Sequence, residues 1–345
     1  MEIVRAVRME DLDQLWDLIE QSTYGLTTLQ ITKEQLSERI ELSNFAFTRK
    51  VEKATGDPYV MVMEDQLTRS LVGLSCIFSK TGGYEPFYSY RRVVELQTCE
   101  HLGIQQEVEV LVLDKLHDGP TEIGSLFLRP DYRGKGRGRL LSLARFLFMA
   151  MNPRRFSDRV IAEMRGVSTD DGQSPFWDAI LQHFFKMQFP QADRLSTINK
   201  RFIEDLMPRH PIYTCLLSDE VRAVMGQVHP TTRPALAMLE AEGFSITNHI
   251  DIFDGGPMVS CQRDKIGAVQ RCKFGRVSQI VSDVDQSLLM LASKQGGFRA
   301  MLSNAKSLED GIVISEKAAE ALQVNLNDEL ILADLYPTLD TSEGA

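Results

Sequence analysis

A glycine-rich, cationic loop between an apolar strand and a long helix constrains the fold more than any other segment. An apolar run at 123–128 precedes Arg-Pro-Asp-Tyr-Arg-Gly-Lys-Gly-Arg-Gly-Arg at 129–139, and an amphipathic segment follows at 140–148. Glycine tolerates positive φ and lets backbone N–H groups approach a ligand, and a helix N-terminus favours an anion. The pattern predicts strand, loop and helix around a pyrophosphate. The residues expected to hold it are Arg133, Gly134, Lys135, Gly136, Arg137 and Gly138.

The spacing of this loop excludes two common nucleotide motifs. A P-loop requires Ser or Thr where Leu140 and Leu141 stand, and the third glycine comes too early for a dinucleotide fingerprint. Arg-x-x-Gly-x-Gly, formed by Arg133, Gly136 and Gly138, resembles the acyl-CoA loop of the GNAT superfamily of N-acyltransferases. The alternative is a basic surface turn before an ordinary helix, but strand, cations, glycines and helix together favour the acyl-CoA loop.

A second segment, at 232–244, resembles the late helix of GNAT proteins. Ala235 and the Gly243-Phe244 end match that pattern, whereas Thr232 and Leu239 replace its Asn and Tyr. In the superfamily this Tyr commonly protonates the departing CoA thiolate. The resemblance therefore implies that this chain either uses another proton donor or works without one.

The composition argues against several classes of binding partner. The net charge is −10 and the pI about 5.2, so one short basic loop makes a poor footprint for nucleic acid. No signal-peptide pattern and no apolar stretch of membrane-spanning length is present in the sequence, which predicts a cytoplasmic protein without a membrane partner. The five cysteines and six histidines are scattered, so no metal site is expected.

The hydrophobic periodicity predicts a mixture of strands and helices whose order resembles the opening of a GNAT fold, so we expect an α+β, GNAT-like architecture. We expect a strand at 3–8, a helix at 10–21, a turn at 24–29, a helix from Thr32, and strands at 59–63 and 71–78. The domain predictions are an acyltransferase domain at 1–255, with insertions at about 80–118 and 160–230, a small β-rich C-terminal domain at 256–336 and a tail at 337–345.

Several unusual phrases carry a more specific resemblance. They are Phe-Leu-Phe-Met-Ala at 146–150, Ala-Glu-Met-Arg-Gly at 162–166, Ser-Pro-Phe-Trp at 174–177, His-Pro-Ile-Tyr at 210–213, Gly-Gln-Val-His-Pro at 226–230 and Ile-Asp-Ile-Phe-Asp-Gly-Gly-Pro at 250–257. Together they make the chain resemble the bacterial arginine N-succinyltransferases of arginine catabolism. The resemblance implies transfer of succinyl from succinyl-CoA to the α-amino group of L-arginine, giving N2-succinylarginine and CoA. It implies no metal and no permanently bound cofactor. L-Ornithine as a second substrate stays open, and the resemblance implies a homo-oligomer or a hetero-oligomer with a paralogous subunit.

The same resemblance implies two site residues. His229 is the catalytic histidine, and Leu126 is the succinyl-CoA contact on the central strand. We expect the main chain from Leu126 to Leu128 to donate an N–H group to the oxyanion. His229 also precedes the helix that usually carries the missing Tyr, which favours a proton-donor role. The alternative for His229 is a loop histidine that caps this helix.

The terminal carboxylate of a succinyl group should meet a cation. Arg165 is one hypothesis for that cation, and Glu163 is a hypothesis for the carboxylate that receives the substrate guanidinium. A structural Glu/Arg pair at a strand end explains both residues equally well. Two other functions stay open: an acyltransferase for ornithine or another amine, and a non-catalytic acyl-CoA-binding subunit of a heteromeric succinyltransferase.

Overall fold

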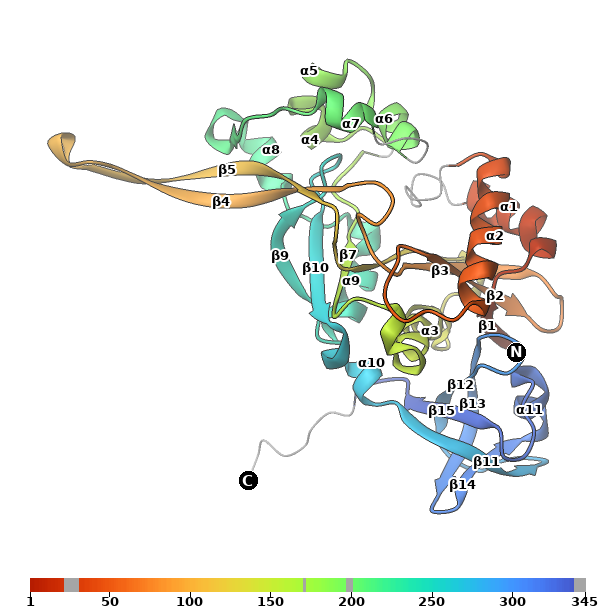
Figure 1. Ribbon diagram of the computed structural model, residues 1–345. Coiled ribbons are helices and arrows are strands. Elements are labelled where there is room, and N and C mark those ends of the chain that lie inside the picture. Colours follow the sequence, from red (N-terminus) through yellow and green to blue (C-terminus); the bar gives the residue numbers. More distant parts are fainter. Residues whose placement is uncertain (22–30, 170–171, 197–200, 338–345) are drawn as a thin grey trace, which may run out of the picture.

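The computed structural model describes residues 1–21, 31–169, 172–196 and 201–337, and Figure 1 shows their mixture of strands and helices. The chain is α+β, as predicted. The turn predicted at 24–29 lies outside the described residues, as do residues 338–345 of the predicted tail.

The elements follow the predicted order with shifts of a few residues. The strands are β1 (Glu2–Ala6), β2 (Pro58–Asp65), β3 (Leu71–Phe78), β4 (Phe87–Cys99), β5 (Ile104–Leu116), β6 (Thr121–Leu128), β7 (Arg159–Glu163), β8 (Ile212–Tyr213), β9 (Ser245–Ile250), β10 (Pro257–Gln262), β11 (Lys273–Val281), β12 (Leu288–Ser293), β13 (Arg299–Leu308), β14 (Gly311–Ser315) and β15 (Glu329–Asp334). The helices are α1 (Leu12–Glu20), α2 (Lys33–Thr48), α3 (Arg137–Met151), α4 (Pro175–Ala179), α5 (Gln182–Phe185), α6 (Phe189–Ser196), α7 (Arg201–Leu206), α8 (Asp219–Val224), α9 (Arg233–Glu240), α10 (Gly267–Gln270) and α11 (Glu316–Leu322).

The central sheet runs in the order β1-β2-β3-β6-β7-β10-β9-β4-β5-β8. All neighbours are antiparallel except β6 and β7, which pair in parallel only at Thr121 with Val160 and at Glu122 with Ile161. Beyond these two pairs no further β6–β7 pairing is recorded in the described chain. The two strands therefore separate before either one ends, and the residues beyond these two pairs face the gap between them, where a ligand can bind.

Helices cover both faces of the β1-β2-β3-β6 part of the sheet. Every residue of β2 is buried. Tyr59, Met61 and Met63 belong to the core beneath α3, whereas Val60 and Val62 belong to the core beneath α1 and α2. Because side chains alternate along a strand, a strand covered on both faces is apolar at almost every position.

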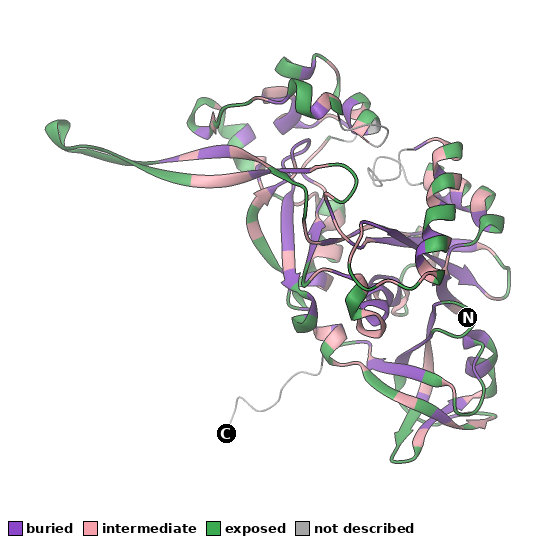
Figure 2. Cartoon of the chain, viewed as in Figure 1, coloured by how far each residue is buried: buried purple, intermediate pink, exposed green. Residues whose placement is uncertain are grey.

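The two predicted insertions correspond to a hairpin and to a group of short helices. β4 and β5 pair from Phe87 with Leu116 to Cys99 with Ile104, and the distal half of this hairpin extends away from the body and is exposed (Figures 1 and 2). Helices α4–α8 pack around a separate core that includes Trp177. β7, at the start of the second predicted insertion, pairs with β6 and β10 in the central sheet. We therefore propose that the second insertion begins only after β7.

The C-terminal strands close into a ring in the order β12-β15-β11-β14-β13, because β13 pairs again with β12. α11 packs on these strands, and Ile3 of β1 shares their core. β10 falls in the region predicted for the C-terminal domain but pairs with β7. We therefore propose that the domain boundary lies after α10, near residue 272, instead of at 255.

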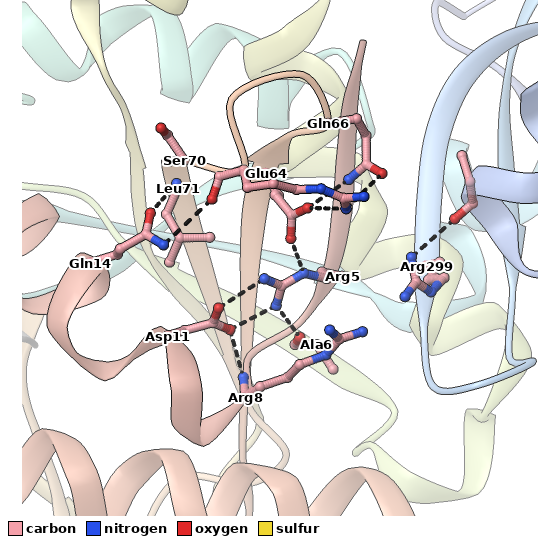
Figure 3. Close-up of polar contacts among 12 residues, drawn as sticks. Arg5, Ala6, Arg8, Asp11, Gln14, Glu64, Gln66, Ser70, Leu71 and Arg299 are labelled. Carbon is pink, nitrogen blue, oxygen red and sulfur yellow. Dashed lines mark hydrogen bonds and ion pairs between the residues drawn. The ribbon is translucent and has the colours of Figure 1, made fainter.

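A buried polar network fixes β1 against its neighbours (Figure 3). Arg5 donates from Nη1 and Nη2 to the two carboxylate oxygens of Asp11, at 2.7 and 2.8 Å, and from Nε to Oε2 of Glu64 at 2.6 Å. Arg299 of β13 stands directly opposite Arg5 in the β1–β13 pairing and donates to the carbonyl of Ala321. This network ties the C-terminal ring and the central sheet to the same strand.

Candidate active site

A cavity of about 230 Å³ opens where β6 and β7 part. One wall is β6 from Glu122 to Leu126, and the opposite wall is the end of β7 from Ala162 to Arg165. The other lining residues come from α3, α6, α9 and the loops before α9 and β10. They are Ser142, Arg145, Phe189, Asp193, Thr231, Thr232, Ala235, Leu239, Asp251, Phe253 and Asp254.

β6 carries a bulge at the cavity. Leu74 pairs with Phe127 and Cys76 with Gly124, so two residues of β6, Ser125 and Leu126, stand opposite Ser75 alone. Ser125 has φ of +50°, a conformation that turns the main chain out of the regular ladder. Leu126 lines the cavity, as a site residue should.

Leu128 has a different environment from Leu126. Its side chain is buried in the core beneath α3 and is not among the residues that line the cavity. We therefore propose that the bulge at Ser125 and Leu126 supplies the oxyanion donor, and the main-chain role of Leu128 stays a prediction.

The glycine-rich loop leads from the end of β6 into α3, as predicted. Gly134, Lys135 and Gly136 have φ of +94°, +51° and +77°, and Gly136 is the residue before the first turn of α3. A Cβ at Gly136 would come within 2.7 Å of a terminal methyl carbon of Leu335, so the Leu335 side chain would have to shift, and the positive φ of Gly136 itself favours glycine. The first turn of α3 contains no acidic residue, which leaves its positive end unopposed.

The loop cations fall into two groups. Arg133 and Lys135 are exposed and form no ion pair with any residue that the structure describes. Arg137 forms an ion pair with Glu2 at 2.6 Å and lies over the ring of Tyr132. Gly138, the last predicted loop residue, already lies within α3.

His229 lies on the turn between the cavity and α9. Its Nδ1 accepts a hydrogen bond from the backbone N–H of Thr231 at 3.2 Å and lies 2.7 Å from the Thr231 hydroxyl. Because a backbone N–H can only donate, the neutral ring must carry its proton on Nε2. The backbone N–H of His229 donates to the carbonyl of Arg165 at 2.8 Å, which ties the turn to the end of β7.

Carboxylates gather on the β7 side of the cavity. Glu163, Asp193, Asp251 and Asp254 all line it, together with Arg165. Asp254 accepts from the backbone N–H groups of Gly166 and Gly256, and burial raises its pKa well above the ordinary value, with a further contribution from Asp251. Burial and the Asp251 charge raise the pKa of Asp193 to about 7, against the lowering effect of Arg165.

Arg165 belongs to this acidic cluster. Its Nη2 donates to the Ser168 hydroxyl at 2.7 Å. Burial lowers its pKa, and the Asp254 and Asp193 carboxylates oppose that shift. Arg165 thus lies among carboxyl groups of the protein, of which Asp193 is partly ionised at neutral pH.

A second cavity, of about 360 Å³, adjoins the first. The two share Glu122, Glu163, Asp193, Asp251 and Phe253. These shared residues form a common wall between the two cavities, and four of the five are acidic. A cation that enters from this side therefore meets acidic side chains from β6, β7, α6 and the loop before β10.

Comparison with known proteins agrees with this geometry. Residues 2–268 match the family model described as arginine N-succinyltransferase beta subunit. The chain belongs to the arginine N-succinyltransferase family. Arginine N-succinyltransferase subunit beta of Pseudomonas aeruginosa is 46% identical over 268 residues, which are 77% of this chain and 78% of the relative. Arginine N-succinyltransferase of an Enterobacter species is 37% identical over 345 residues, covering 99% of this chain and 100% of the relative.

A solved structure extends the likeness to the fold of the whole chain. Arginine/ornithine succinyltransferase subunit AI of Pseudomonas aeruginosa superposes with a TM-score of 0.88 and 31% identity, covering 97% of this chain and 99% of that one. The chain is therefore an acyltransferase of the α+β, GNAT-like fold predicted from the sequence. The family match ends at residue 268, within α10, close to the domain boundary proposed from the strand pairing.

The described residues contain neither a membrane-spanning helix nor a cluster of metal ligands. No helix there combines the length and the apolar character needed to cross a bilayer. No group of three or more His, Cys, Asp or Glu side chains is placed there to hold a metal ion.

Several of the residues that line the cavity were not predicted from the sequence. Nothing in the local sequence of Glu122 or Asp193 marks these carboxylates, and Asp251 and Asp254 lie in the phrase at 250–257, which carried the family resemblance but no assigned role. Arg145 did leave a signal. It is a lone cation inside the run Leu140–Met149, every residue of which is buried.

Proposed function

We propose that this chain transfers succinyl from succinyl-CoA to the α-amino group of L-arginine, giving N2-succinylarginine and CoA. The observation that carries this function is the cavity between β6 and β7, which combines a strand bulge with a wall of carboxylates. A bulge offers main-chain N–H groups to an acyl oxygen, and carboxylates suit a cationic amino acid.

The acyl-CoA co-substrate enters from the loop side in this proposal. Its pyrophosphate lies on Arg133–Gly138 and the N-terminus of α3, where the backbone angles and the exposed cations favour an anion. Its acyl arm passes between the diverging strands to the bulge. Leu126 contributes through its main chain, and its side chain forms part of the wall.

The amino acid enters through the second cavity. The shared carboxylates, Glu163 among them, receive its guanidinium, and its α-amino group points toward the thioester at the bulge. The amine must lose a proton before it attacks, because an ammonium group has no lone pair. The carboxylates of the cavity wall provide the acceptor.

His229 completes the reaction as the proton donor to the CoA thiolate. The donor is the imidazolium form, in which Nδ1–H donates to the Thr231 hydroxyl at 2.7 Å and Nε2–H gives its proton to the leaving sulfur, leaving the neutral ring. Leu239, which replaces the usual Tyr, lines the cavity but has no proton to give. The position of His229 on the preceding turn supports this assignment.

Two finer points are also part of the proposal. L-Ornithine is a second amine substrate, by analogy with the arginine/ornithine succinyltransferase subunit that this chain resembles. Assembly with further subunits is expected, because the names of two relatives describe them as subunits.

The test is release of free CoA thiol from succinyl-CoA by the purified chain, with arginine, ornithine and lysine compared. We expect arginine-dependent release that falls about 10²–10⁴-fold in His229→Ala. His229→Asn is the matched control, because Asn can still cap the turn but cannot transfer the proton. Activity retained in His229→Asn would reduce His229 to a structural cap. Tight succinyl-CoA binding without release, for any amine, would favour a non-catalytic subunit.

A further inference from the structure

One buried cation of the cavity is not accounted for by the reaction described above. Arg145 lies in the middle of α3, only 2% of the residue is exposed, and it lines the cavity beside Ser142. Burying a guanidinium in an apolar helix costs free energy unless a negative group compensates the charge. The contacts of Arg145 therefore need an explanation.

Those contacts are all neutral. Nε donates to the carbonyl of Ser142 at 2.9 Å, Nη2 donates to the Ser142 hydroxyl at 2.8 Å, and Nη1 lies 3.5 Å from the carbonyl of Gly124. A guanidinium has five N–H groups. No carboxylate of the described residues forms an ion pair with it, and its N–H groups are not all used.

The position of Arg145 relates it to the acyl group. Gly124, which its Nη1 approaches, directly precedes the bulge at Ser125 and Leu126, and all of these residues line the same cavity. In the proposed reaction the thioester carbonyl sits at the bulge. The far end of a four-carbon acyl chain then extends deeper into the cavity, toward α3.

Resting on the proposed function, we propose that Arg145 binds the terminal carboxylate of the succinyl group and so sets the acyl specificity of the enzyme. The carboxylate would complete the guanidinium with two charge-assisted hydrogen bonds, and it would compensate the buried charge. Both effects are absent for an acetyl group or any other neutral acyl group. The unfavourable free energy of the buried Arg145 charge is then offset only when an acyl group with a terminal carboxylate binds.

Arg165, the cation first suggested by the sequence, is less suited to this role. It lies near Asp193 and Asp254, and Asp193, whose pKa is about 7, is ionised in part of the molecules at neutral pH and would then repel an entering carboxylate. Arg145 has no such neighbour: burial lowers its pKa to about 10, opposed only by the Cys76 thiol, so it stays charged at neutral pH. The two arginines thus divide the cavity, with Arg165 in the acidic part for the amine and Arg145 at the acyl end.

The experiment crosses two enzymes with two thioesters. The enzymes are the wild type and Arg145→Met, which keeps an unbranched apolar stem. The thioesters are succinyl-CoA and the CoA thioester of succinamic acid, which replaces the terminal carboxylate by a neutral amide of the same size. Both kcat/KM with arginine and the Kd of each thioester without arginine are measured. Arg145→Lys retains the charge without the planar fork, and Arg165→Gln tests the other arginine.

We expect Arg145→Met to lose about 100-fold in kcat/KM for succinyl-CoA and less than about threefold for the amide, so that discrimination between them collapses. Arg145→Lys should lie between wild type and Arg145→Met. Equal losses for both thioesters would mean that Arg145 only supports the fold. Unchanged discrimination in Arg145→Met, with a loss in Arg165→Gln, would overturn the assignment in favour of Arg165.

The binding measurement separates this inference from the proposed function. If the wild type shows no amine-dependent thiol release but binds succinyl-CoA more tightly than the amide through Arg145, the proposed transfer fails and the carboxylate site stands. If transfer occurs and Arg145→Met leaves both discrimination ratios unchanged, the transfer stands and the carboxylate site fails.

Discussion

Two arginines are buried almost equally deeply in this molecule, and their surroundings differ completely. Arg5 is 5% exposed and Arg145 is 2% exposed. Arg5 contacts the carboxylates of Asp11 and Glu64 (Figure 3), whereas Arg145 donates to neutral oxygen atoms of Ser142 and Gly124 and forms no ion pair with a carboxylate of the described residues. A paired cation between a strand and a helix holds the fold together, and an unpaired cation at a cavity is available to a ligand.

The pKa values follow the same division. Burial alone would lower the pKa of Arg5, but Asp11 and Glu64 raise it above its ordinary value. Burial would likewise raise the pKa of Glu64, and the hydrogen bond from Arg5 lowers it instead. In the cavity no opposite charge outweighs the effect of burial on Arg145 or on Asp193. Burial therefore lowers the pKa of Arg145 and raises the pKa of Asp193. Groups without partners are the ones whose charge a bound substrate can stabilise.

The largest expected effect comes from breaking the paired region. Arg5→Met removes the partner of two buried carboxylates, so the free energy of unfolding should fall by about 3–5 kcal/mol. Arg145→Met removes a buried charge that has no carboxylate partner and should change it by less than about 1 kcal/mol. Urea unfolding at pH 7, followed by the fluorescence of Trp16 and Trp177, measures both variants.

For acyl specificity the order of the two variants is reversed, and Arg145→Met should have the larger effect. Arg5→Met, assayed at a temperature where it is folded, should keep the acyl preference of the wild type, and Arg145→Met should lose it. If Arg145→Met proved the more destabilising of the two, Arg145 would belong with Arg5 among the residues that hold the fold.

An effect of intermediate size is expected at Asp193. Its pKa of about 7 in the folded protein lies above the ordinary value of 3.8, so the folded state binds the proton more tightly than the unfolded state. The free energy of unfolding then decreases as pH rises from about 4 to about 7. Asp193→Asn should be no more stable than wild type at pH 4.5, and more stable by about 1–3 kcal/mol at pH 8.

Thermal unfolding at the two pH values tests this prediction, with Glu240→Gln, an exposed carboxylate of α9, as the control. Arginine should stabilise the wild type more at pH 8 than at pH 6, since its positive charge favours the ionised Asp193. That difference should be small in Asp193→Asn. A stability gain that does not depend on pH would show that Asp193 is not the group that titrates.

The sequence was informative where the chemistry is local. Strand, glycine loop and helix at 123–148 follow from residues that are neighbours in the chain, and the structure has them as β6, the loop and α3. The family resemblance, carried by short phrases, was confirmed by the comparisons. The roles of His229 and Leu126 remain predictions, although the structure places Leu126 in the cavity and His229 on the adjoining turn.

Features that depend on long-range pairing were not accessible from the sequence. Glu122 and Asp251 are more than a hundred residues apart and line one cavity because β6, β7 and β10 share one sheet, and Asp193 joins them from α6. The later domain boundary that we propose also rests on long-range pairing: β10 follows a glycine-rich turn, and only its pairing with β7 shows which sheet it joins. Arg145 was visible as a charge in an apolar helix, but its lack of a carboxylate partner is a property of the folded chain.

The smallest effects are expected for the cations of the glycine-rich loop, which also divide into paired and unpaired residues. Lys135 has no ion pair among the described residues and should contribute directly to phosphate binding, whereas Arg137 is held by Glu2 and Tyr132. Lys135→Ala should raise the KM for succinyl-CoA about 3–10-fold, and less so in high salt, because the charge is exposed and screened. Arg137→Ala should change KM less than about twofold and should lower the Tm slightly, since it breaks a partly exposed pair. Steady-state kinetics at two salt concentrations measures both. A larger KM effect for Arg137→Ala would mean that the pyrophosphate displaces Glu2, and that a cation paired in the free protein can still be a ligand-binding residue.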